Sequence, residues 1–236
     1  MTWSIIARDN ATGQFGIAVA TRFFAVGARV PHIAAGIGGI ATQALVNPYY
    51  GIDGVRLLRE GRKPREIIET LIAADAGHES RQLHIMDAGG RIASHTGSEC
   101  VDWCGHIEGN GFSIAGNMLA GASVLDDTAE TYKANESLPF AQRLIAAMRS
   151  GEAAGGDKRG RQSAALLIYG DEEWSDLDLR VDDHTDPLGE LGRLEQVSRE
   201  RWVHFRQFLP TRKNPAGITD RAAIDARIEA AIAGQK

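Results

Sequence analysis

The first twenty-two residues constrain the fold more than any other stretch of this sequence. Two apolar runs, Trp3–Ala7 and Phe15–Thr21, have the composition of strands, and Asn10–Gly13 between them carries the Asn and Gly of a tight turn. This pattern predicts a β-hairpin whose first strand begins at Thr2. Neither run alternates cleanly between apolar and polar residues, so we expect both faces of the hairpin to be buried.

The remaining sequence alternates between strand-like and helix-like segments that mostly occur in pairs. Further strands are predicted over about 40–44, 82–87, 91–95, 111–115, 162–169 and 177–181, and helices over about 47–61, 63–77, 123–135, 138–148, 186–205 and 219–235. This order predicts an α+β fold of antiparallel sheets flanked by helices. No linker divides the chain, so we expect one domain over residues 1–236, with the helices after about residue 186 packed on it or on a partner subunit.

Composition and charge exclude several classes of function. The formal net charge is −5 and the sequence pI is about 5.8, which argues against nucleic acid and anionic membranes as partners. No apolar run reaches the roughly 18 residues of a membrane helix, and the start of the chain lacks the pattern of a signal peptide. We therefore expect a cytoplasmic protein. No dinucleotide or P-loop fingerprint occurs, and we expect no organic cofactor.

Thr2 is the first candidate for catalysis. If Met1 is removed, Thr2 combines a hydroxyl nucleophile with its own α-amine, a base whose pKa of about 8 leaves it partly neutral at physiological pH. Threonine after an initiator methionine is also common in proteins without any such role. A buried strand that begins at this residue favours the functional interpretation, because chain ends are usually loose.

Two further segments are candidates for the same site. Gly116 and Asn117 follow a short strand and could present a backbone N–H and a side-chain amide to an oxyanion, although a turn that simply needs glycine explains them equally well. The loop before the strand at 162–169 carries charged and polar residues at the strand entrance, where a guanidinium could hold a substrate carboxylate. Those expected to bind substrate are Asp157, Arg159, Arg161, Gln162 and Ser163. The alternative is that these loop charges are merely solvated.

A small group of potential metal ligands lies in the middle of the chain. His95, Cys100, Cys104 and His106 fall within twelve residues, and all four side chains are of types that bind zinc. Their spacing lacks the paired C-x2-C of the common zinc motifs, which favours incidental clustering. We expect no metal site and reduced thiols.

Four segments carry a recognisable pattern: MTWSIIARD at Met1–Asp9, GIAVAT at Gly16–Thr21, GNML at Gly116–Leu119 and GDKRGRQSA at Gly156–Ala164. Together they resemble the DUF1028 family of bacterial and archaeal proteins, which is classed with the N-terminal nucleophile (Ntn) hydrolases. The resemblance covers nearly the whole chain and implies a four-layer αββα sandwich of antiparallel sheets. It implies no particular substrate.

The resemblance also suggests roles for individual residues. Thr2 occupies the place of the nucleophile in the proteasome-like members of the superfamily, and Arg22 matches an arginine near the end of their second strand. The acidic residue expected just before Arg22 is absent, and no lysine occurs between Thr2 and Arg62, although His32 lies at about the right sequence distance. These departures argue against a proteasome-type mechanism.

We therefore expect an Ntn-type amidohydrolase that acts on a small amide or peptide-like bond. Thr2, Arg22 and Asn117 would be catalytic, and His32 would join the loop residues in binding substrate. The alternatives are a ligand-binding protein without catalysis on the same fold and an interaction protein. A homodimer would suit the latter, because the last predicted helix carries apolar residues at Ile224, Ile228 and Ile232.

Overall fold

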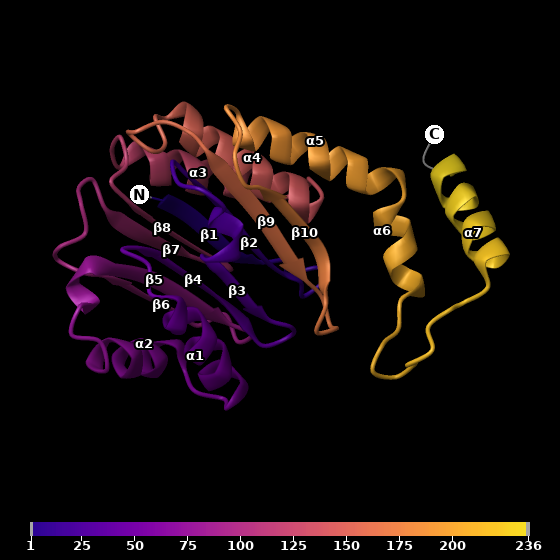
Figure 1. The fold of residues 1–236 in the computed structure, drawn as a ribbon, viewed down its shortest axis with the longest axis horizontal. Coiled ribbons are helices and arrows are strands. Elements are labelled where there is room, and N and C mark those ends of the chain that lie inside the picture. The colour runs from indigo at the N-terminus through magenta and orange to yellow at the C-terminus, as the bar shows by residue number, and fades with distance from the viewer. Residues whose placement is uncertain (1, 235–236) are drawn as a thin grey trace. The chain divides into compact units, whose positions relative to one another are not determined.

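The structure is a computed structural model that describes residues 2–234 (Figure 1). Its strands are β1 (Thr2–Arg8), β2 (Phe15–Thr21), β3 (Pro31–Ala34), β4 (Gly38–Ala44), β5 (Arg81–Asp87), β6 (Ile92–Thr96), β7 (Gly105–Gly109), β8 (Phe112–Asn117), β9 (Ser163–Tyr169) and β10 (Ser175–Val181). Its α-helices are α1 (Pro48–Arg59), α2 (Pro64–Ala73), α3 (Ser123–Ala134), α4 (Phe140–Ala153), α5 (Pro187–Glu200), α6 (Trp202–Phe205) and α7 (Arg221–Ala233). The predicted α+β class with antiparallel sheets is confirmed.

The helices begin where local sequence signals place them. The Asn47 side chain caps α1 by accepting a hydrogen bond from the Tyr49 N–H at 3.1 Å, and Pro48 occupies the first turn. Pro64 opens α2 in the same way, and the Asp220 side chain caps α7. No helix within residues 2–234 has the length and apolar character needed to cross a membrane.

The larger sheet has six antiparallel strands in the order β10-β9-β2-β1-β8-β7. The strand β1 lies inside it, with Trp3 opposite Ala20 of β2 on one side and opposite Gly116 of β8 on the other. Every residue from Thr2 to Ala7 is buried. The predicted hairpin with two buried faces is therefore confirmed.

A second sheet, in the order β3-β4-β5-β6, packs against the first. Apolar side chains from both sheets form the contact, among them Ile6, Ile17, Val19, Ile33, Ala41 and Met86. The helices α1 and α2 cover the other face of the smaller sheet, and α3 and α4 pack on the larger one (Figure 1). This packing buries both faces of β1.

Two strands, β3 and β7, were not predicted. The sequence around β7 reads as irregular because its side chains alternate between partly buried and exposed positions, and it carries glycine at both ends. The short β3 lies in a segment rich in glycine and alanine. Each strand is at the edge of its sheet, where pairing with one neighbour needs little apolar sequence.

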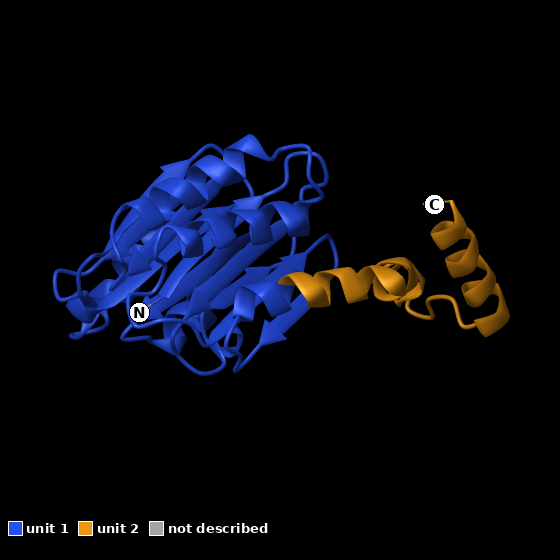
Figure 2. Cartoon of the chain, turned by 90° about the horizontal axis from the view of Figure 1, so that it is seen from above, with its two compact units in different colours: residues 1–191 blue, residues 192–236 orange. Residues whose placement is uncertain are grey.

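The chain divides into two compact units, residues 1–191 and 192–236 (Figure 2). The second unit has a small core of its own, in which Phe208, Ile224 and Ile228 are buried and Ile232 packs against them. The apolar stripe of α7, expected to face the rest of the domain or another subunit, is thus covered by Phe208 within the same unit. That the chain forms one domain over residues 1–236 stays a prediction.

The contact between the two sheets gives a first test. We expect Ile6→Ala to lower the free energy of unfolding by about 2–5 kcal/mol, because Ile6 is fully buried between the sheets and its truncation leaves a cavity. Ile52→Ala on α1 is the control, because this side chain is 56% exposed and should change stability by less than about 0.5 kcal/mol. Urea denaturation of both variants measures the difference, and equal losses would contradict the packing described.

Candidate functional site

Three strand ends meet at the first residue of β1. Because β1 runs antiparallel to both of its neighbours, its start lies beside the end of β2 and the end of β8. The Thr2 hydroxyl donates a hydrogen bond to the Thr21 hydroxyl at 3.2 Å, and Asn117 lies opposite Thr2 in the β8 register. All three side chains are buried, and Thr2 retains 6% exposure. The sheet thus gathers two hydroxyls and an amide at one point.

Buried amide side chains connect this point to the smaller sheet. The Asn117 Nδ2 donates to the Thr2 carbonyl at 3.4 Å and to Gln82 Oε1 at 3.0 Å. The Gln43 Nε2 donates to the same Gln82 oxygen at 2.8 Å and to the Ala115 carbonyl at 3.0 Å. Gln43 and Gln82 come from β4 and β5, so this amide network, formed by Gln43, Gln82 and Asn117, ties the second sheet to the head of β1.

A buried histidine extends the network away from the strand end. The Ser4 hydroxyl donates to Gln43 Oε1 at 2.7 Å, and His84 Nε2 lies 2.9 Å from the same hydroxyl oxygen. Since the Ser4 proton is already used, the hydrogen-bond pattern assigns the His84 proton to Nε2, and Nδ1 accepts from Ser113 at 2.9 Å. Complete burial lowers the pKa of His84 to about 3, so this imidazole is a neutral bridge between the sheets.

Asp157 holds the loop before β9 against the end of β2. Its carboxylate is buried and accepts hydrogen bonds from the backbone N–H of Arg22 at 2.6 Å and from that of Arg159 at 2.9 Å. The Arg159 guanidinium pairs with it at 3.3 Å. Gly156 and Gly160 on either side have positive φ, which lets the chain turn sharply around the carboxylate. Asp157 is therefore engaged as the anchor of its loop.

Gln162 and Ser163 lie in the same place. Ser163 begins β9 opposite Thr21, and its buried hydroxyl donates to the Phe23 carbonyl at 2.5 Å. Gln162 accepts a hydrogen bond from the Arg22 guanidinium at 3.3 Å. These contacts connect the turn after β2 to the loop before β9, and they leave Arg22 at the surface.

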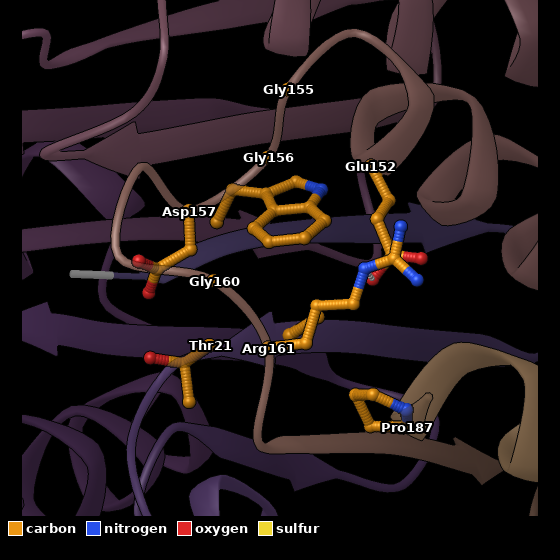
Figure 3. Close-up of a pocket in the computed structure, with 10 residues that line it drawn as sticks. Thr21, Glu152, Gly155, Gly156, Asp157, Gly160, Arg161 and Pro187 are labelled. Carbon is orange, nitrogen blue, oxygen red and sulfur yellow. Dashed lines mark ion pairs between the residues drawn. The ribbon is translucent and has the colours of Figure 1, made fainter. Parts of the chain in front are cut away.

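A cavity of about 230 Å³ opens next to this cluster (Figure 3). It is lined by Trp3, Ala20, Thr21, Glu152, Gly155, Gly156, Asp157, Gly160, Arg161 and Pro187. Figure 3 shows Arg161 and Glu152 at one side and Asp157 and Thr21 at the other. The Arg161 Nε lies 3.4 Å from Glu152 Oε1, and burial raises the pKa of Glu152 despite this cation. The cavity thus combines a half-exposed guanidinium with a carboxyl that accepts a proton more readily than usual.

His32 lies apart from these residues. It is on β3, where it pairs with Ile40, whose side chain belongs to the core beneath α1 and α2. The imidazole packs against Gly51 of α1, where a Cβ would lie 2.3 Å from the ring. Burial lowers the pKa of His32. The structure therefore does not bring His32 together with the other predicted site residues, because distance along the sequence does not determine which face of a sheet a side chain takes.

The His and Cys residues between 95 and 106 make protein contacts. His95 Nε2 lies 3.0 Å from the His78 carbonyl, and the Cys104 thiol lies 3.5 Å from the Cys100 carbonyl. Both thiols are free, and burial raises the pKa of Cys100 to about 11. Among the residues that the structure describes, no group of three or more His, Cys, Asp or Glu side chains has the arrangement of a metal site.

Four residues that shape the site were not predicted from the sequence: Thr21, Gln43, Gln82 and Glu152. Gln43 and Gln82 did carry a signal, because each is an uncharged polar residue near the end of a predicted strand that also carries apolar residues. Such a residue, when buried, needs hydrogen-bond partners from another element. Nothing in the sequence indicates that these partners are the ends of β1 and β8.

Comparison with known proteins gives a family and a solved relative. The family of unknown function DUF1028 matches residues 2–191. The crystal structure of protein SPO2555 from Silicibacter pomeroyi, described as DUF1028, is 33% identical with a TM-score of 0.86 and covers 93% of this chain and 96% of its own. Anbu (ancestral beta-subunit) from Yersinia bercovieri is 13% identical with a TM-score of 0.42, over 83% of this chain and 94% of its own. No curated protein matches the chain.

The amide network gives a test of what holds the site together. Gln82→Met removes the group that pairs with Gln43, Asn117 and the Gly116 carbonyl. We expect the free energy of unfolding to fall by about 3 kcal/mol or more, because each buried polar group left without a partner costs about 1–3 kcal/mol. Guanidinium denaturation measures it, and a loss below about 0.5 kcal/mol would show that the network is not required.

His84 gives a prediction of pH dependence. Its folded pKa of about 3 lies below the unfolded value of about 6.5, so the unfolded chain binds the proton more readily. Its contribution to stability is therefore complete above about pH 6.5 and is lost as the pH falls toward 3, by about 1.4 kcal/mol per pH unit. We expect His84→Gln to be less stable than the wild type at pH 7 and to close that gap on acidification to pH 4.5. Urea denaturation at a series of pH values measures the gap, and a constant gap would contradict the prediction.

Proposed function

The chain belongs to the DUF1028 family, a family of unknown function, and we propose that it is an Ntn-type amidohydrolase that cleaves a small amide or peptide-like bond through Thr2. In this proposal the two packed sheets with α1 and α2 on one and α3 and α4 on the other form a four-layer αββα sandwich. The protein acts in the cytoplasm on a small molecule. The proposed reaction uses groups of the chain and needs no organic cofactor.

The observation that carries the proposal is the position of Thr2. It begins an interior strand, its hydroxyl is 3.2 Å from that of Thr21, and Asn117 lies opposite it. Arg22 and the loop anchored by Asp157 meet the same strand ends. A nucleophile held in a buried strand keeps a fixed position relative to its neighbours, which favours attack on a bound carbonyl carbon.

The chemistry requires Thr2 to be the first residue of the mature protein. Met1 lies outside the described residues, and its removal would leave the α-amine of Thr2 free. In its neutral form that amine accepts the hydroxyl proton while Oγ1 bonds to the carbonyl carbon of the substrate. Collapse of the tetrahedral intermediate breaks the C–N bond and releases the amine with that proton, and water then hydrolyses the Thr2 ester.

The surrounding residues would take separate roles. The Asn117 amide now donates to the Thr2 carbonyl and to Gln82, so stabilising an oxyanion requires a change in one of these bonds. Arg161 at the cavity edge is suited to hold a substrate carboxylate, and Arg159, 40% exposed as a side chain, is a second cation nearby. Asp157, Gln162 and Ser163 position this loop. The proposal assigns no role to His32.

A second candidate function has one specific observation in its favour. The cavity is lined by Thr21, Glu152 and Arg161 but not by Thr2, which is itself buried. A protein that binds a small molecule there without catalysis would have this arrangement, and it would have no need to remove Met1. A homodimer or another partner protein would be compatible with this function.

The nucleophile is tested by substitution at Thr2. Protein made without tags at its N-terminus should lack Met1 by intact-mass measurement, and a panel of N-acyl amino acids and dipeptides serves as substrates. We expect Thr2→Ala to reduce turnover at least about a thousandfold, because the attacking oxygen is lost. Thr2→Ser should keep part of the activity.

Thr12→Ala is the matched control. Thr12 lies in the exposed turn between β1 and β2, where its hydroxyl bonds to Asp9, and its loss should leave turnover unchanged. Activity that survives Thr2→Ala, or survives an extra residue before Thr2, would exclude the proposed mechanism. Ligand binding without turnover by protein that starts at Thr2 would favour the second candidate function.

A further inference from the structure

A second cavity lies at the far end of β1 from Thr2. It has a volume of about 420 Å³ and is formed where β1 ends, around the β7–β8 turn and the facing parts of α3 and α4. Since β1 has seven residues at about 3.3 Å each, the two ends of the strand are roughly 20 Å apart. This cavity is therefore separate from the proposed catalytic site.

Two cations on this cavity lack partners. Within residues 2–234, neither the Arg8 guanidinium nor the Lys133 ammonium makes a hydrogen bond or an ion pair. The Arg8 Nε is buried without an acceptor, although a buried donor is normally satisfied. A buried N–H of a permanently charged group is costly to leave unpaired. An anion in the cavity would supply the missing acceptor, since both residues line it.

The other charged groups of the cavity are already engaged. The Arg143 guanidinium lies 3.8 Å over the Tyr132 ring, donates to the Tyr132 carbonyl at 2.7 Å and pairs with Glu136 at 3.6 Å. The Glu108 carboxylate accepts a hydrogen bond from Ser94 at 2.9 Å. Neither carboxylate is paired with Arg8 or Lys133, and the three cations Arg8, Lys133 and Arg143 against the two carboxylates Glu108 and Glu136 leave the lining with a formal charge of +1.

Two aromatic residues also line the cavity. Phe112 and Tyr132 are 4% and 2% exposed, and their ring centroids are 5.3 Å apart with a tilt of 57°. Aromatic walls beside unpaired cations favour a ligand with a planar apolar body and an anionic group. We propose that this cavity binds a small organic anion, a carboxylate or phosphate monoester on an aromatic body, with Arg8 and Lys133 as its charge partners.

The test uses benzoate and phenyl phosphate as the two anionic probes and benzyl alcohol as the uncharged one. Isothermal titration and thermal shift with the full chain should show binding of one or both anions and at least about tenfold weaker binding of benzyl alcohol. The stronger anion identifies the headgroup. Lys133→Gln and Arg8→Gln should each weaken its binding about tenfold or more, because each removes a charge-assisted contact.

Arg65→Gln is the control, because this side chain lies on α2, is 87% exposed and should leave anion binding unchanged. Lys133 is exposed on α3, so its variant is expected to fold even if Arg8→Gln does not. Unchanged anion binding by folded Lys133→Gln would overturn the proposal. Binding of neither anion at about 10 mM, or equal binding of benzyl alcohol, would overturn it as well.

Discussion

The amide network between the two sheets is the interaction on which the head of β1 depends. Gln43 and Gln82 project from the smaller sheet and donate to backbone carbonyls of β8, and Gln82 also accepts a hydrogen bond from Asn117. In an apolar interface such amides are costly unless every partner is in place, so they permit one register of the sheets and disfavour others. The β1–β8 ladder places Thr2 opposite Asn117, and the network holds both residues against the smaller sheet.

A second set of contacts positions the loop before β9 beside the same site. Asp157 accepts the backbone N–H of Arg22, and Gln162 accepts the Arg22 guanidinium, so the loop before β9 follows the end of β2. The charged residues that line the cavity between this loop and α4 are Glu152, Asp157 and Arg161. The network therefore fixes the residues inside the sheet, whereas hydrogen bonds and the ion pairs of Arg159 and Arg161 hold the loop before β9. The ion pairs make this loop the part of the site that is more sensitive to salt.

The family match and the solved relative cover different shares of the chain. The DUF1028 match covers residues 2–191, which is nearly the whole of the first compact unit, and ends at its last residue. SPO2555 shares the fold over 93% of the chain. The descriptions of the family and of SPO2555 name no activity. The proposed function therefore rests on the strand ends at Thr2 and on the experiments at that residue.

The sequence by itself determined the local elements, whereas the contacts across the sheets were decided by the tertiary structure. The N-terminal hairpin, the capped starts of α1 and α7 and the clustering of Asp157 with Arg159 follow from neighbouring residues, because turns, caps and short loops depend on local geometry. The partners of Gln43 and Gln82, the cover of Phe208 over α7 and the side of β3 on which His32 lies depend on residues far away in the chain. Periodicity shows that a face is buried, but it does not name what buries it, since many surfaces satisfy the same apolar pattern.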